Sequence, residues 1–157
     1  MRDLFFNISP KSKEKLLGTL EASNLYLKKG EKIRSSIKQD NIIGLVEKGI
    51  LTIIKLDYNG NLSVIEELNE GSIFGSTMVY NQKDEYEIIA KSNTIITIID
   101  LNSIYNYDIT SLSVYNQFLK NLVLIMEEKI AKSNERIEIL TNKTIRNKLL
   151  TYFNILS

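Results

Sequence analysis

The spacing of hydrophobic and polar positions changes twice along the chain, and these changes predict three regions. Leu16, Leu17 and Leu20 recur among charges after the single proline, which predicts a short amphipathic helix over residues 9–22. From residue 25 to about residue 100, short runs rich in Ile, Val, Thr and Tyr replace that pattern. From Ser113 to Leu140, apolar residues recur at spacings of three, four and seven, which is typical of one long helix.

The short runs predict β-strands. Seven or eight of them follow one another at roughly ten-residue spacing, separated by turn signals at Lys29-Gly30, Lys48-Gly49, Asn59-Gly60 and Glu70-Gly71. Asn59-Gly60 is the sharpest of these signals, because Asn and Gly adopt the positive φ of a tight hairpin turn at least cost. The pattern favours an antiparallel sandwich or jelly roll over a parallel sheet.

The long helix carries an apolar seam. At about 1.5 Å per residue it would be ~40 Å long, which is more than a small barrel needs for cover. A helix that outruns its own domain and keeps an apolar stripe usually packs against a second copy, so we expect a homodimer; the alternative is a helix that simply lies across the sheet. The predicted dimerisation residues are Leu119, Leu122, Met126, Ile130, Ile137 and Leu140.

Two polar residues, Ser133 and Asn134, interrupt this seam. They could fix the register of a dimer or could reach a ligand at the wall of the β-roll, and both readings stay open. Beyond them, Ile145, Leu149 and Phe153 recur at helical spacing with nothing obvious left to cover, which indicates that a further segment follows Ser157. The expected division is a β-roll with its short helix over residues 1–112, a dimerisation helix over residues 113–142, and the start of a hinge over residues 143–157.

The composition favours binding over catalysis. The 157 residues include no cysteine and no histidine, which disfavours disulfides, zinc, iron–sulfur clusters, haem and the usual hydrolase triads, so no cofactor or metal is expected. The net charge of +1 gives no overall basic field that would hold nucleic acid. The first residues are too polar for a signal peptide and no apolar run approaches about 20 residues, so we expect a cytoplasmic chain without a membrane partner.

The glycines and the order of elements carry a family resemblance. Gly30, Gly49, Gly60, Gly71 and Gly75 punctuate the roll, together with the stretches "GEKI", "GLVEKGILTI" and "NEGSIFGS". With a short helix before and a long helix after, the chain resembles the effector domain of the Crp/Fnr family of bacterial transcription regulators over nearly its whole length. The resemblance implies a cyclic-nucleotide-binding-like jelly roll, a homodimer and an unknown small-molecule effector. It also implies that DNA is contacted only through a helix-turn-helix domain that these residues do not include.

The loop that would hold a cyclic phosphate departs from the family pattern. Cyclic-nucleotide-binding members carry Gly-Glu-Leu at its start and Arg-Ser or Arg-Thr at its end, whereas this chain has Gly75-Ser76-Thr77 and Tyr86-Glu87. No arginine occurs between Arg34 and Arg136, so no shift of the alignment supplies one. Each lost charge-assisted hydrogen bond costs roughly 1.5 to 3 kcal/mol, so we do not expect cyclic AMP or cyclic GMP to be the effector.

The residue types in this loop leave several readings open. Ser76 and Thr77 could donate to a polar ligand or cap the backbone, and Tyr86 could seal the pocket or contact a more apolar ligand. Glu87 alternates with Tyr86 along a strand, so only one of the two can face into the roll. The candidate ligand-binding residues are Gly75, Ser76, Thr77, Tyr86, Glu87, Ser133 and Asn134.

Two other classes of function compete with a transcription regulator. One is a cyclic-nucleotide-binding module of another signalling protein, against which the missing arginine counts. The other is a cupin-like jelly-roll enzyme, whose metal is held largely by histidines; since the chain has none, we expect no enzyme.

Overall fold

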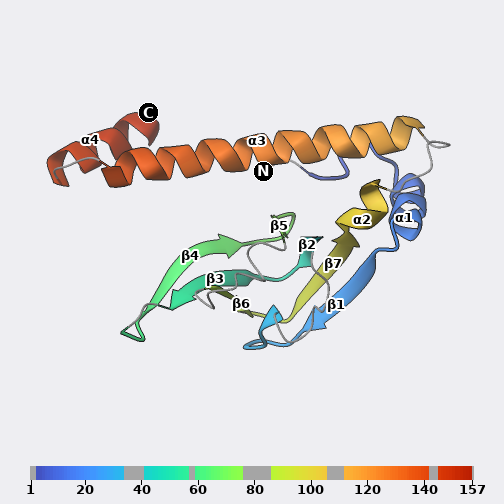
Figure 1. Cartoon of the computed structure of the whole chain (residues 1–157), viewed down its shortest axis with the longest axis horizontal. Helices are drawn as coiled ribbons and strands as arrows, with labels where there is room; N and C mark the ends of the chain where they lie inside the picture. Colours follow the sequence, from blue (N-terminus) through green and yellow to red (C-terminus); the bar gives the residue numbers. More distant parts are fainter. Residues whose placement is uncertain are drawn as a thin grey trace.

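The computed structural model describes residues 3–33, 41–56, 59–75, 86–105, 112–141 and 145–156. A short helix precedes the strands, and two longer helices follow them (Figure 1). The helices are α1 (Pro10–Thr19), α2 (Leu101–Tyr105), α3 (Leu112–Thr141) and α4 (Ile145–Leu156). The strands are β1 (Ser23–Leu27), β2 (Ile42–Lys48), β3 (Leu51–Leu56), β4 (Leu62–Leu68), β5 (Ile73–Gly75), β6 (Tyr86–Ala90) and β7 (Thr94–Asp100).

The strands form two antiparallel sheets. One has the order β1-β7-β2-β5 and the other the order β4-β3-β6. Fully buried Ile, Leu and Val side chains from both sheets fill the space between them, including Val46, Leu51 and Ile96. The predicted fold class, an antiparallel jelly roll followed by a long helix, is therefore confirmed.

The hairpin between β3 and β4 is confirmed, but its turn differs from the prediction. The strands pair until Leu56 lies opposite Leu62, so the connection is longer than a two-residue turn. Gly60 has a positive φ of 81°, whereas Asn59 is not among the described residues with positive φ. The expectation of a positive φ at Asn59 as well as at Gly60 is therefore wrong for Asn59, because the connection is longer than a two-residue turn.

Gly44 holds β2 close to an aromatic ring. It lies opposite Phe74 of β5, and a Cβ atom at this position would come within 2.1 Å of the Phe74 ring carbon Cζ. Any side chain would push the ring away from the core, where Phe74 is buried. The glycine therefore fixes how β5, which leads into the candidate loop, packs on β2.

A second apolar core lies outside the roll, where the N-terminal segment and α1 meet α2 and the start of α3 (Figure 1). The ring of Phe118 on α3 stacks on Phe5, with centroids 6.0 Å apart. The buried amide Nδ2 of Asn121 donates to the carbonyl oxygens of Leu4 and Phe6, at 3.0 and 2.8 Å. These contacts hold the N-terminal segment against the first half of α3.

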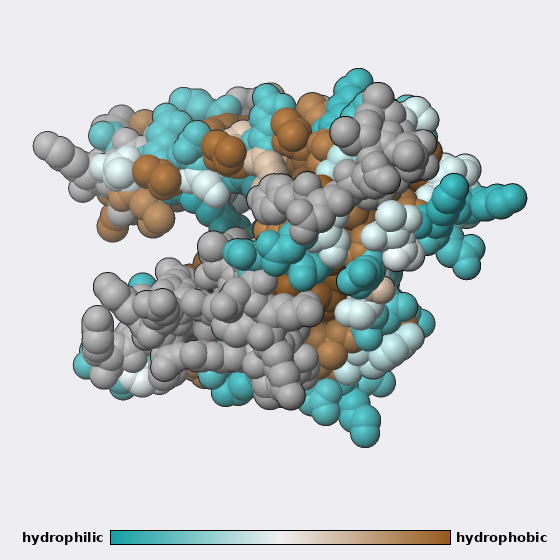
Figure 2. Space-filling view, turned by 45° about the vertical axis from the view of Figure 1, so that its right-hand side comes forward, coloured by the Kyte–Doolittle hydropathy of each residue, from teal (hydrophilic) through white to brown (hydrophobic). Residues whose placement is uncertain are grey.

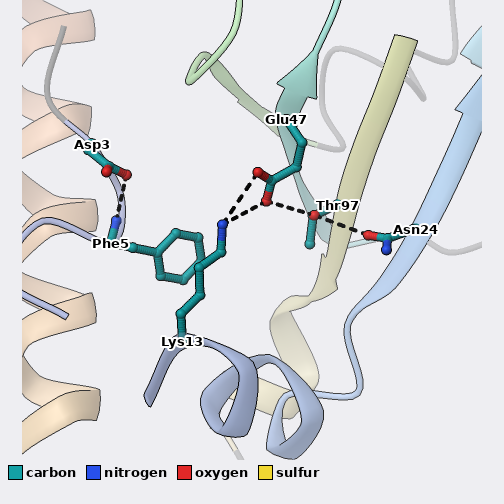
Figure 3. A network of polar contacts seen from close by, with 6 residues as sticks. All are labelled: Asp3, Phe5, Lys13, Asn24, Glu47 and Thr97. Atoms are coloured by element: carbon teal, nitrogen blue, oxygen red, sulfur yellow. Dashed lines mark hydrogen bonds and ion pairs between the residues drawn. The ribbon is translucent and has the colours of Figure 1, made fainter. Parts of the chain in front are cut away.

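An ion pair ties α1 to the roll. Lys13 Nζ lies 3.1 Å from Glu47 Oε1 on β2 and 4.4 Å from the centroid of the Phe5 ring. Figure 3 shows this pair continued by Thr97 on β7, whose hydroxyl donates to Glu47 Oε1 at 3.0 Å. Asn24 Oδ1 on β1 lies 3.2 Å from the same hydroxyl. The network therefore links α1 to three neighbouring strands, β2, β7 and β1.

The long helix agrees with its predicted bounds but presents two stripes instead of one. Phe118, Asn121 and Ile125 are buried against the body of the molecule. The predicted seam residues Leu119, Leu122 and Met126 each follow one of them by a single position, which is about 100° around an α-helix. Leu119 and Leu122 are half-buried, whereas Met126 is exposed. The core-facing stripe escaped sequence reasoning because it includes a buried asparagine.

Candidate functional site

The glycine-rich approach to the candidate loop is held by β2. Gly71 has a positive φ of 81°, and its N–H donates to the carbonyl oxygen of Val46 at 2.8 Å. The N–H of Val46 in turn donates to the carbonyl oxygen of Ser72. Gly75, the last residue of β5, pairs with Ile43. The first glycine thus makes a turn that only a residue with this freedom adopts cheaply, and the second places the start of the loop beside β2.

Part of the predicted ligand loop lies outside the described residues. This holds for Ser76 and Thr77, and for the side chain of Tyr86, whose backbone belongs to β6. The carboxylate of Glu87 lies 2.7 Å from Lys32 Nζ, and both side chains are partly exposed. Lys91, the cation that directly follows β6, pairs with Glu67 at 2.6 Å. Neither Glu87 nor Lys91 is among the described residues that line the grooves beside α3.

Ser133 and Asn134 line a polar groove between α3 and β4. Its volume is about 260 Å³, and three of its eight lining side chains are cationic. Lys129 Nζ lies 3.5 Å from Glu66 Oε1 on β4, and Arg136 Nη1 donates to the carbonyl oxygen of Ile65 at 3.2 Å. The full lining is Glu66, Met126, Lys129, Ile130, Lys132, Ser133, Asn134 and Arg136.

A larger apolar groove adjoins the polar one. It has a volume of about 730 Å³ and lies between α3 and the start of β2, the end of β5 and the start of α2. Met126 and Ile130 line both grooves, so the two are continuous along the helix. The full lining is Ile42, Ile43, Gly75, Leu101, Leu122, Val123, Met126, Glu127 and Ile130. Gly75 and the predicted pair Ser133 and Asn134 therefore border neighbouring stretches of one surface.

Sequence reasoning missed most residues of this surface. Ile42 and Ile43 at the start of β2 and Leu101 at the start of α2 carry no signal of their own, because nothing in a single sequence says that α3 passes over them. A signal did exist for the cations, since Lys129, Lys132 and Arg136 recur at spacings of three and four. Residues with this spacing share one side of a helix.

The predicted seam is exposed over its second half. Ile130, Ile137 and Leu140 are 62%, 57% and 71% exposed, although all three are large and apolar. Exposed apolar residues continue onto α4 at Ile145 and Phe153. Figure 2 shows these apolar side chains along the helical arm that the end of α3 forms with α4. In the described chain this arm therefore leaves much of its apolar surface in water.

The described residues contain no group of three or more acidic, Cys or His side chains placed to hold a metal ion. Within the same part of the chain, no helix is both long and apolar enough to span a bilayer.

The comparisons with known proteins concern the fold. No protein-family model matches the chain, and no curated protein sequence matches it. Among solved structures, it is similar to a mutant of CooA from Carboxydothermus hydrogenoformans, with a TM-score of 0.67, 18% identity, and coverage of 96% of this chain and 93% of that one. It is also similar to a cyclic nucleotide-binding domain from Methylobacillus flagellatus, with a TM-score of 0.65, 15% identity, and coverage of 88% and 77%.

A third relative is the catabolite activator protein of Thermus thermophilus, with a TM-score of 0.61 and 16% identity. The match covers 88% of this chain and 62% of that protein, so this chain spans less than two thirds of the length of the catabolite activator protein. All three relatives share the roll followed by a long helix. The chain therefore has the cyclic-nucleotide-binding-like fold found in regulators of the Crp/Fnr type, which confirms the structural side of the predicted resemblance.

Proposed function

We propose that the chain is the ligand-sensing and dimerising domain of a Crp/Fnr-type transcription regulator that does not respond to cyclic AMP. The observation that carries this proposal is the course of α3. Its first half packs on the roll, its flank forms one wall of a groove, and its second half exposes an apolar seam. A ligand in the groove would touch the roll and the helix together, so its binding would be linked to how the helix meets a second copy. As a regulator the protein would act in the cytoplasm and would have no enzymatic activity.

The mechanism is a shift between two arrangements of the paired helices. An effector moves such an equilibrium only as far as it binds one arrangement more tightly than the other, and a decisive switch needs a difference of a few kcal/mol. In this proposal Gly75, where the candidate loop begins, borders one side of the site, and Ser76, Thr77, Tyr86 and Glu87 stay predicted ligand contacts. Ser133 and Asn134 lie on the helix side. DNA would be bound by a helix-turn-helix segment beyond Ser157, and finding one encoded there would support this class of function.

The exposed seam leads to a direct test. At tens of micromolar the chain should run as a dimer on size exclusion with light scattering. Replacing both Ile137 and Leu140 by Glu should give a monomer whose β-sheet circular dichroism signal is unchanged. Both side chains are exposed and lie far along α3 from its buried part. Tyr26→Glu, at an equally exposed apolar position on β1, is the matched control and should stay dimeric. A wild-type monomer at this concentration would contradict the proposal.

A cyclic-nucleotide-binding module of another signalling protein is the second candidate, because one structural relative is such a domain. The two candidates differ in their response to cyclic nucleotides. We expect millimolar cyclic AMP or cyclic GMP to leave the melting temperature unchanged, since the loop offers no arginine for the phosphate. A clear rise in the melting temperature would favour the second candidate.

A further inference from the structure

We propose that the two adjoining grooves beside α3 bind one amphipathic carboxylate. This inference rests on the proposed function and names the class of its effector. The carboxylate group would lie among Lys129, Lys132 and Arg136, and the hydrocarbon body would lie against Met126, Ile130 and the apolar wall beyond them. Ile137 and Leu140, which line neither groove, would then carry the contact with the second copy.

The charge of the polar groove favours an anion. Three cationic side chains line it, and Glu66 is the single carboxylate among the described residues that do so. Lys129 already lies 3.5 Å from Glu66, so the remaining excess positive charge sits on Lys132 and Arg136. An anion bound in the groove would be attracted to both of these cations.

The donors of this groove suit a carboxylate in particular. A guanidinium has five N–H donors, so Arg136 can keep its bond to the Ile65 carbonyl and still present a fork to two carboxylate oxygens. Ser133 and Asn134 add a hydroxyl and an amide to the same wall. These groups are all hydrogen-bond donors of the kind that a carboxylate accepts from.

The apolar groove requires a hydrocarbon body on the same molecule. Its lining is apolar except for Glu127 at one margin, and it meets the cationic groove at Met126 and Ile130. A free inorganic anion would leave this surface in water, whereas a neutral hydrocarbon would leave the cations unpaired. The volume of the apolar groove, about 730 Å³, falls in the range of small-molecule sites, and the adjoining groove adds about 260 Å³. A single elongated molecule with one anionic end satisfies both surfaces.

Decanoate is a suitable probe for calorimetric titration of the full chain, at concentrations below micelle formation. We expect one decanoate per chain, binding about tenfold or more tightly than decan-1-ol, which has the same tail without the charge. Decylammonium, with the opposite charge, should bind more weakly than either. Raising the salt from about 0.1 M to 1 M should weaken decanoate but not decan-1-ol, because salt screens exposed charges.

Variants on each groove separate the two contributions. Lys132→Gln should weaken the binding of decanoate, and the double variant with Arg136→Gln should weaken it further. Neither should change the binding of decan-1-ol. The single variant leaves the hydrogen bond from Arg136 to the Ile65 carbonyl in place. Val123→Ser, in the apolar wall, should weaken both probes. Lys120→Gln is the matched control, because Lys120 is an exposed cation of the same helix that does not line either groove.

Equal affinity for decanoate and decan-1-ol would overturn the inference, as would decanoate binding that survives the double variant. So would stronger binding to anionic vesicles than to free decanoate, which would mark a membrane surface. The proposed function fails on different evidence, namely a monomeric chain. A dimer that responds to a neutral or cationic metabolite and ignores decanoate would leave the proposed function standing and remove only this inference.

Discussion

The two halves of α3 have the same apolar spacing and opposite surroundings. From Leu112 to Ile125 the helix packs on α1, α2 and the N-terminal segment, and Phe118 is completely buried. From Met126 to Thr141 most of its large apolar residues are exposed, namely Met126, Ile130, Ile137 and Leu140. A helical repeat therefore predicts that a face will be covered, but it does not say whether the cover comes from the same chain or from another molecule.

Two polar contacts among the described residues join the second half of α3 to the roll. Lys129 pairs with Glu66, and Arg136 donates to the Ile65 carbonyl. Such partly exposed contacts contribute little to the stability of the fold, whereas a buried aromatic stack stabilises it by removing a large apolar area from water. The first half of α3 is thus held firmly by apolar packing, and the second half is held weakly by polar contacts. A shift of the second half would therefore cost less free energy than a shift of the first.

The largest expected change in the free energy of unfolding comes from the first half of α3. Phe118→Ala should lower the free energy of unfolding by about 3–5 kcal/mol, because it opens a cavity next to Phe5. Urea denaturation followed by circular dichroism measures this change. Val123→Ala, five positions along and 64% exposed, should change the same quantity by less than about 0.5 kcal/mol. Equal costs would mean that the buried and the exposed faces of this half do not differ as described.

A smaller effect is expected at the polar contact of the same half. Asn121→Ala should cost about 1–3 kcal/mol, because it leaves the carbonyl oxygens of Leu4 and Phe6 without their buried donor. The variant should also make the N-terminal segment more sensitive to proteolysis. Asn116→Ala, on the exposed side of α3, serves as the control and should do neither. An unchanged protease pattern for Asn121→Ala would show that the segment is held by its apolar contacts alone.

The smallest effect is expected in the second half. Lys129→Gln should lower the free energy of unfolding by no more than about 1 kcal/mol, because its pair with Glu66 is partly exposed. Lys120→Gln should change it by less still. A cost that approaches that of Phe118→Ala would show that β4 holds the second half as firmly as the core holds the first.

The sequence predicted the elements of the fold well and the candidate site only in part. The first helix, the antiparallel strands, the β3–β4 hairpin and the length of α3 all follow from local signals such as turn glycines and apolar spacing. Ser133 and Asn134 were selected because they break a pattern, and they do line a groove. Ile42, Ile43 and Leu101 were missed because they break no pattern and gain their importance from what packs above them.

The dimer, the effector and the roles of Ser76, Thr77 and Tyr86 remain predictions. The amino-acid sequence by itself determined the order of helices and strands, because backbone propensity and the spacing of apolar side chains are local properties of the chain. What only the tertiary structure decided is which stripe of α3 faces the core. Leu119 and its neighbours look like the better core residues, yet Phe118, Asn121 and Ile125 are the buried ones. The reason is physical: Asn121 finds two carbonyl partners there, and a buried amide is stable only where such partners exist.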